Sequence, residues 1–146
     1  MEVLSNNDGL VTNIEVLELM RERQAAHESK YHTSLLENRE HIEKSTIKYL
    51  QDKMKDTGKG KGATVAMNTQ FLAEIARLSA LPITEKNSLR NVRLTEAELV
   101  ELSNHQPKAE VELLLLILDC HVRCTEDQVN VILNAVRTCF ELDISS

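Results

Sequence analysis

Two thiols and an imidazole lie close together in the segment Cys120-His121-Val122-Arg123-Cys124. Cysteine and histidine are the usual ligands of structural zinc, but such sites normally combine one cysteine pair with a second pair of ligands elsewhere. The remaining cysteine, Cys139, is single, and His105 could join only if the fold brought two turns together. The pattern therefore favours small, buried apolar residues at Cys120 and Cys139, and we predict no metal site.

A second candidate for chemistry is the glycine-rich and lysine-rich segment 56–66. A phosphate-binding P-loop requires the pattern GxxxxGK[ST], and here neither Lys59 nor Lys61 is followed by Ser or Thr. The spacing excludes that kind of nucleotide site and indicates a flexible, solvated loop. The lysines could still make a weak contact with the phosphate backbone of RNA, although no aromatic residue lies nearby to stack on bases.

No constellation in the chain is typical of catalysis. A nucleophile paired with a base, or two carboxylates held in one pocket, does not stand out from ordinary charges on helix surfaces. His105 differs from the other histidines because it lies in a turn between two predicted helices. A side chain there either caps a helix end or contacts a partner, and the capping role is favoured. We therefore predict a protein that is not an enzyme and needs no cofactor.

Composition indicates which elements position these residues. The chain has 146 residues, of which 42% are hydrophobic and only 3% aromatic, with four glycines and two prolines. A core of Leu, Ile, Val and Ala with so few turn residues favours an all-α fold, with room for one domain and a helical appendage. The longest apolar run, residues 113–118, falls far short of the roughly 20 residues that span a bilayer. We expect no membrane contact.

Charge is distributed unevenly along the chain. Residues 44–93 contain ten Lys or Arg against four Asp or Glu, whereas residues 95–146 contain three against ten. A basic middle and an acidic end fit either complementarity within the molecule or two partner surfaces of different charge.

Capping signals divide the chain into helices. Thr12 and Glu15 form a capping box that predicts a helix start near Ile14. The apolar residues of this helix cover more than half of its circumference, which is too wide for packing on one side and suggests that a second chain covers part of it. These residues are Ile14, Val16, Leu17, Leu19 and Met20.

Further helices are predicted downstream. The first runs from about residue 34 to residue 54 and carries a stripe that includes Ile42, Tyr49 and Leu50. Asn68 is expected to cap the helix that follows the glycine and lysine segment, and capping boxes at Thr95 and Thr125 open two later helices. In the helix at about 108–119, Val111 and the apolar run 113–118 leave almost no polar face, which predicts the central and most buried position in a C-terminal bundle.

The order of three motifs resembles one known family. These motifs are LTEAEL at 94–99, NHQP at 104–107 with its Asn104, His105 and Pro107, and CTEDQ at 124–128. Together they resemble the smaller stalk subunit of RNA polymerase III, and LVTNIEVL at 10–17 and TIKYL at 46–50 extend the resemblance over nearly the whole chain.

The resemblance implies an HRDC-like helical bundle at 67–146 and, at 1–55, a segment that docks on the larger stalk subunit, with the loop 56–66 between them. That larger subunit carries an oligonucleotide-binding barrel. Further implied partners are the RNA polymerase III core, the initiation factor TFIIIB and, weakly, RNA, all in the nucleus. The wide apolar arc from Ile14 to Met20 and the stripe of Ile42, Tyr49 and Leu50 would form the partner-binding surface.

An alternative function remains open from the sequence. Because HRDC-like domains often bind single strands and residues 44–93 are basic, the chain could be a single-stranded nucleic-acid-binding module outside the polymerase. The acidic C-terminal half argues against this function, since like charge repels phosphate.

Overall fold

The structure is a computed structural model that describes residues 10–28, 34–55, 57–58 and 62–142. Within these ranges the chain forms helices and no strand, which confirms the prediction of an all-α fold with a helical bundle and an N-terminal helical segment. The helices are α1 (Asn13–Glu28), α2 (Ser34–Lys53), α3 (Val65–Ala80), α4 (Glu96–His105), α5 (Glu110–Leu116), α6 (Cys120–Arg123) and α7 (Glu126–Cys139).

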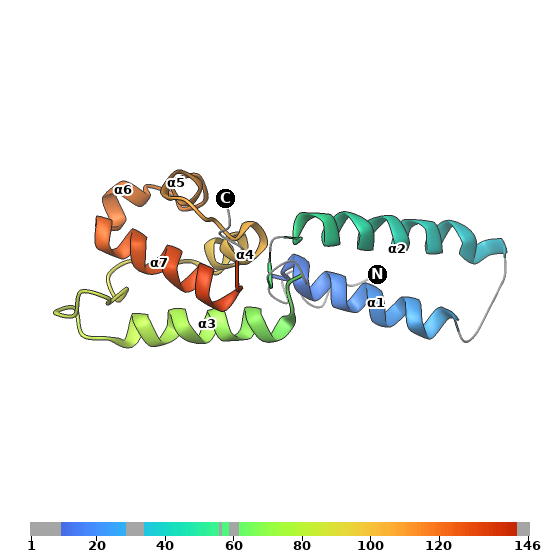
Figure 1. The fold of residues 1–146 in the computed structure, drawn as a ribbon, viewed down its shortest axis with the longest axis horizontal. Helices are drawn as coiled ribbons and strands as arrows, with labels where there is room; N and C mark the ends of the chain where they lie inside the picture. The colour runs from blue at the N-terminus through green and yellow to red at the C-terminus, as the bar shows by residue number, and fades with distance from the viewer. Residues whose placement is uncertain (1–9, 29–33, 56, 59–61, 143–146) are drawn as a thin grey trace, which may run out of the picture.

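Helices α1 and α2 lie side by side as an antiparallel hairpin that extends away from the rest of the molecule (Figure 1). The predicted capping box opens α1, because the Thr12 hydroxyl accepts from the Glu15 N–H at 3.3 Å and the Glu15 carboxylate accepts from the Thr12 N–H at 3.4 Å. Ile47 and Leu50 on α2 and Met54 directly after it are buried and recur at helical spacing. The hairpin thus has an apolar seam of its own.

Helices α3 to α7 form the C-terminal bundle, and α1 contacts it at α3 and α4. The two phenylalanines of the chain meet at its centre, where Phe71 of α3 and Phe140 at the end of α7 have ring centroids 5.3 Å apart and planes tilted by 44°. Tilted pairs of this kind are favourable beyond the area they bury. Leu102, Leu113 and Ile132 are fully buried and bring α4, α5 and α7 into the same core.

With the box at α1, the capping predictions are confirmed at three helices and wrong at a fourth. Thr95 and Thr125 both form complete capping boxes, with Glu98 and Gln128 as the reciprocal partners. Helix α3, however, is capped by Thr64, whose hydroxyl accepts from the Met67 N–H at 3.2 Å, rather than by Asn68. Asn68 lies one turn inside α3 and is buried, so it cannot cap the helix.

The expectation that the helix at about 108–119 is the most buried one is wrong. Helix α5 ends at Leu116, and the chain then turns through Asp119, whose φ of 52° is left-handed, into the short helix α6. Only the side of α5 that carries Leu113 faces the core, with Ile117 buried just after it, so much of the apolar run lies at the surface. Among the described residues, no helix combines the length and the apolar character that crossing a bilayer requires.

Candidate partner interface and the junction that positions it

The structure divides the predicted partner-binding residues into three groups. Ile14, Leu17 and Leu50 are buried within the chain's own core. Val16 and Met20 are half-buried and pack against that core. Leu19, Ile42 and Tyr49 are 45%, 63% and 57% exposed, so they are the apolar side chains of this set that a partner can reach.

Two of the buried residues still lie at the surface of a groove. Ile14 and Leu17 form part of a groove of about 400 Å³ where α1 meets the start of α3, and Ala63 and Val65 line the opposite wall. Arg21 of α1 also borders this groove. A mostly apolar groove between two helices is a common place for a partner's side chains to insert.

The orientation of the hairpin depends on the motif at 104–107. The Asn104 side-chain oxygen accepts a hydrogen bond of 2.8 Å from the backbone N–H of Asn13, the first residue of α1. A second link comes from Glu96, whose carboxylate accepts from the Leu10 N–H at 3.3 Å. Helix α4 therefore supplies acceptors to the start of α1, where backbone donors have no partner within the helix.

Gln106 makes the second part of this connection. It occupies the left-handed position after α4, with a φ of 48°, and its side chain is buried. The Gln106 amide oxygen accepts from the Thr57 hydroxyl, and its nitrogen donates to the Ser103 carbonyl at 3.1 Å. We call Asn13, Thr57, Asn104 and Gln106 the junction, because their hydrogen bonds tie the hairpin and the segment after it to the bundle.

Between α2 and α3, residues near both ends of the connecting segment are anchored to the rest of the chain. The Gly58 N–H donates to the Phe140 carbonyl at 2.8 Å, and Thr57 and Ala63 are buried. Gly58 has a φ of 62°, and a Cβ there would lie 2.7 Å from the Gly62 carbonyl oxygen, so glycine is required. Asp56, Lys59 and Lys61 lie outside the described residues, and the predicted RNA contact of the two lysines stays a prediction.

The other two residues of the family motif play different parts. His105 points its Nε2 at the Glu101 carboxylate, 3.0 Å away on the exposed side of α4. Pro107 is fully buried directly after the turn. The sequence singled out His105, but the buried hydrogen bond between the bundle and the segment after α2 is made by Gln106 and Thr57. The left-handed position after a helix is usually occupied by Gly or Asn, so nothing in the sequence marked Gln106 for this place.

The segment 120–124 is organised around Arg123. Its guanidinium contacts both carboxylate oxygens of Glu98, at 2.6 and 3.0 Å, and donates to the carbonyls of Val92, Arg93 and Leu118. Burial raises the pKa of the Cys124 thiol to about 12. Among the described residues, no group of three His, Cys, Asp or Glu side chains could hold a metal ion.

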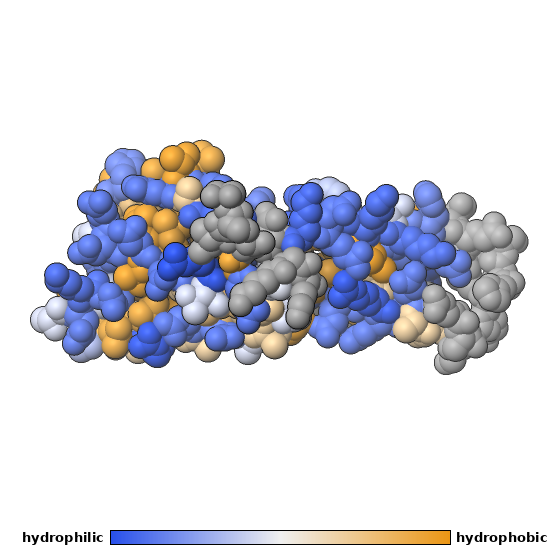
Figure 2. All heavy atoms as spheres, viewed as in Figure 1, coloured by the Kyte–Doolittle hydropathy of each residue, from blue (hydrophilic) through white to orange (hydrophobic). Residues whose placement is uncertain are grey.

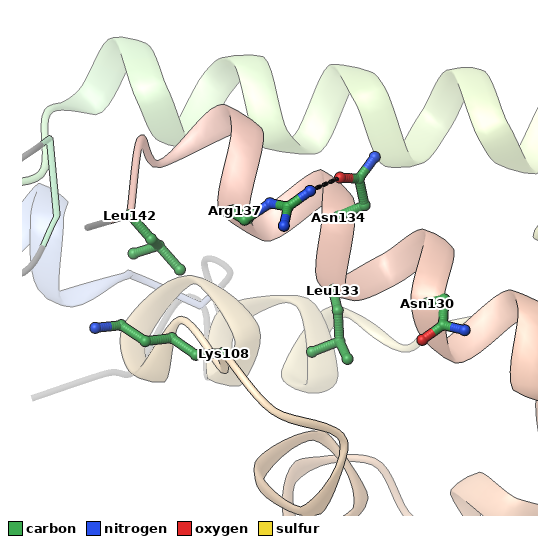
Figure 3. A pocket seen from close by; sticks show the side chains of 6 residues that line it. All are labelled: Lys108, Asn130, Leu133, Asn134, Arg137 and Leu142. Carbon is green, nitrogen blue, oxygen red and sulfur yellow. Dashed lines mark hydrogen bonds between the residues drawn. The ribbon is translucent and has the colours of Figure 1, made fainter. Parts of the chain in front are cut away.

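The bundle also has a pocket of about 410 Å³ beside α7 (Figure 3). Two cationic side chains, two amides and two leucines line it, and Arg137 donates to Asn134 at 2.7 Å. None of these side chains is a carboxylate, thiol, hydroxyl or imidazole. The lining residues are Lys108, Asn130, Leu133, Asn134, Arg137 and Leu142. The pocket offers hydrogen-bond donors and positive charge rather than a nucleophile with its base.

The hairpin, the junction and the bundle together match one known protein family. The family model described as RNA polymerase Rpb4 matches residues 10–140, which cover the hairpin, the junction and the bundle. Members of this family are accessory, non-catalytic subunits that form a stalk heterodimer with an Rpb7-like partner on a multisubunit RNA polymerase. The chain therefore belongs to the RNA polymerase Rpb4 family and is a stalk subunit of a multisubunit RNA polymerase.

Proposed function

We propose that this chain is the smaller stalk subunit of RNA polymerase III and that it acts in the nucleus. In this role it supports transcription initiation through the initiation factor TFIIIB and helps guide the transcript. The observation that carries the assignment to polymerase III, among polymerases whose stalk subunits share this fold, is the motif NHQP at 104–107. Support comes from the junction, because Asn104 and Gln106 of this motif are structural residues that orient the hairpin.

The larger stalk subunit is proposed to dock on the N-terminal hairpin. Support comes from the exposed Leu19, Ile42 and Tyr49 and from the apolar groove beside α1. Ile42 and Tyr49 are seven residues apart, so two helical turns place them on the same side of α2. Exposed apolar side chains on a helix pair provide the kind of area that a permanent partner buries.

Affinity purification tests the polymerase assignment. The tagged chain is recovered from nuclear extract at moderate salt, and every co-purifying protein is identified by mass spectrometry. We expect the barrel-containing stalk subunit together with subunits found only in polymerase III. Recovery of subunits specific to another polymerase would reassign the chain within the same family.

Substitutions test the docking surface separately. Ile42→Asp combined with Tyr49→Asp should abolish the heterodimer in gel filtration after coexpression with the larger subunit, because buried unpaired carboxylates oppose association. Ile83→Asp is the matched control, since Ile83 is 69% exposed outside the hairpin and its replacement should leave the heterodimer intact. A heterodimer that survives the double substitution would place the interface elsewhere.

Binding of single-stranded RNA is the second candidate, favoured by the excess of Lys and Arg in residues 44–93. If this is the function, the affinity of the isolated chain for RNA falls steeply with added salt. Replacing Lys59 and Lys61 by Ala would then flatten the salt dependence. A chain that binds no RNA but recovers the polymerase supports the stalk role alone.

A further inference from the structure

A second apolar surface lies on the bundle, far along the chain from the hairpin. Five large aliphatic side chains of α5, α6 and the turn between them are between 39% and 82% exposed. Figure 2 shows hydrophobic atoms gathered over α5. We call this surface the α5–α6 face, and its residues are Val111, Leu114, Leu115, Leu118 and Val122.

Three of these residues form a ridge along α5. Val111, Leu114 and Leu115 follow the i, i+3, i+4 pattern, so they share one side of the helix. Leu118 lies exposed just after the end of α5, and Val122 lies exposed on α6. The opposite side already supplies the core through Leu113. Four of the five side chains are therefore largely open to solvent, and contiguous exposed apolar side chains of this kind often mark a binding surface.

Acidic residues border the α5–α6 face. Glu110 and Glu112 stand on either side of Val111 in the sequence, about 100° away around the helix in each direction. Asp119 is exposed beside Leu118, between α5 and α6. Arg123 has its charge matched by Glu98, and the Glu112 carboxylate also accepts from the backbone N–H of Lys108 at 2.6 Å. A ligand on this face meets leucine and valine at the centre and negative charge at the edges.

We propose that the α5–α6 face binds an amphipathic helix of a partner protein that carries aliphatic residues flanked by Lys or Arg. The ridge matches the apolar stripe of such a helix, and Glu110, Glu112 and Asp119 match its basic flanks. A second copy of this chain fits poorly, since a two-fold contact would bring the same acidic edges together. Nucleic acid is disfavoured for the same electrostatic reason. This inference holds whichever polymerase the chain serves.

Synthetic helical peptides of about 18 residues, five helical turns, provide the probe. One peptide carries Leu at the i, i+3, i+4, i+7 positions with Lys on both flanks, and the other replaces each Lys by Glu. Binding to the full-length chain is measured by fluorescence anisotropy at low and moderate salt. We expect saturable one-to-one binding of the basic peptide, at least ten times tighter than that of the acidic one and weakened by salt.

Variants of the chain locate the binding. Leu115→Glu combined with Leu118→Glu should weaken the binding of the basic peptide at least ten-fold. Circular dichroism should show an unchanged fold, because both side chains are exposed. Ile83→Glu is the matched control and should bind as the wild type does. Equal affinity for both peptides, no saturable binding, or binding insensitive to the double variant overturns the proposal. Self-association of the wild type that the double variant abolishes would instead identify a second copy as the occupant.

Discussion

The side-chain oxygen of Asn104 accepts a hydrogen bond of 2.8 Å from the backbone N–H of Asn13, 91 residues earlier in the chain. The two residues belong to different parts of the molecule, the end of α4 in the bundle and the start of α1 in the hairpin. A side chain from one part therefore caps a helix in the other. This contact makes the stability of α1 dependent on the position of the bundle.

Asn104→Ala should lower the free energy of unfolding by about 1 kcal/mol, because a backbone donor at the start of α1 loses its acceptor. Urea denaturation followed by circular dichroism measures the change. Asn130→Ala is the control, since Asn130 is exposed on α7 and its replacement should stay within about 0.5 kcal/mol of the wild type. Equal effects of the two substitutions would contradict a capping role for Asn104.

Thr57 and Gln106 should be energetically coupled. Thr57→Val leaves the buried amide of Gln106 without its donor, and we expect a loss of about 1–3 kcal/mol of stability. A double-mutant cycle with Gln106→Met should give a coupling energy of about 0.5–3 kcal/mol, because the second change removes the orphaned group. Thr69→Val, on the exposed side of α3, is the control. Additive effects within error would show that the hydrogen bond contributes nothing.

Arg123→Met should destabilise the bundle by about 1–3 kcal/mol, because Glu98 is left as a largely buried, unpaired charge. Arg77→Met offers a close comparison, since Arg77 also pairs with a glutamate, Glu74, but on the exposed surface of α3. Its effect should be much smaller, because solvent screens an exposed pair. Thermal unfolding of both variants measures the difference, and similar midpoints would refute the distinction.

The buried cysteines should react slowly in the folded protein. Burial raises the pKa of the Cys124 thiol to about 12 and also raises that of Cys139, so almost no thiolate is present at pH 8. We expect little alkylation by iodoacetamide in the native state and complete alkylation in denaturant, measured by mass spectrometry. Rapid native alkylation at Cys124 would show that the thiol is accessible.

The same shifts give stability a dependence on alkaline pH. The unfolded thiols ionise near their ordinary pKa of 9.0, whereas the folded Cys124 stays neutral up to about pH 12. The unfolded state therefore binds fewer protons between these values, and stability falls as pH rises through this window. Below pH 9 the neutral Cys124 thiol makes its full contribution to the free energy of unfolding. Cys124→Ala should flatten the alkaline decline in unfolding free energy measured from pH 8.5 to 10.

Local patterns were sufficient to predict where most helices begin. The Thr95 and Thr125 capping boxes depend on residues only three positions apart, so the sequence carries the whole signal. At α3 the predicted cap was Asn68, whereas Thr64 caps the helix. The choice depends on where the preceding segment is anchored, which includes the contact of Gly58 with Phe140 at the far end of the chain.

Features that depend on long-range packing could not be predicted in this way. The apolar run at 113–118 indicates burial, but only contacts with α4 and α7 decide which side of α5 is covered. The junction is another example, since nothing local to Thr57 indicates a bond with Gln106. The apolar arc of α1 predicted a surface covered from two sides, but the sequence did not distinguish the buried Leu17 from the exposed Leu19.

The junction also links folding to the order in which the chain is synthesised. During synthesis the hairpin leaves the ribosome first, but Asn104 and Gln106, to which it must be fastened, follow only after about half of the remaining chain has been added. Closing such long loops is slow compared with forming a helix pair. The hairpin is therefore made well before the residues that hold it against the bundle, and during that interval its apolar side chains are open to a partner.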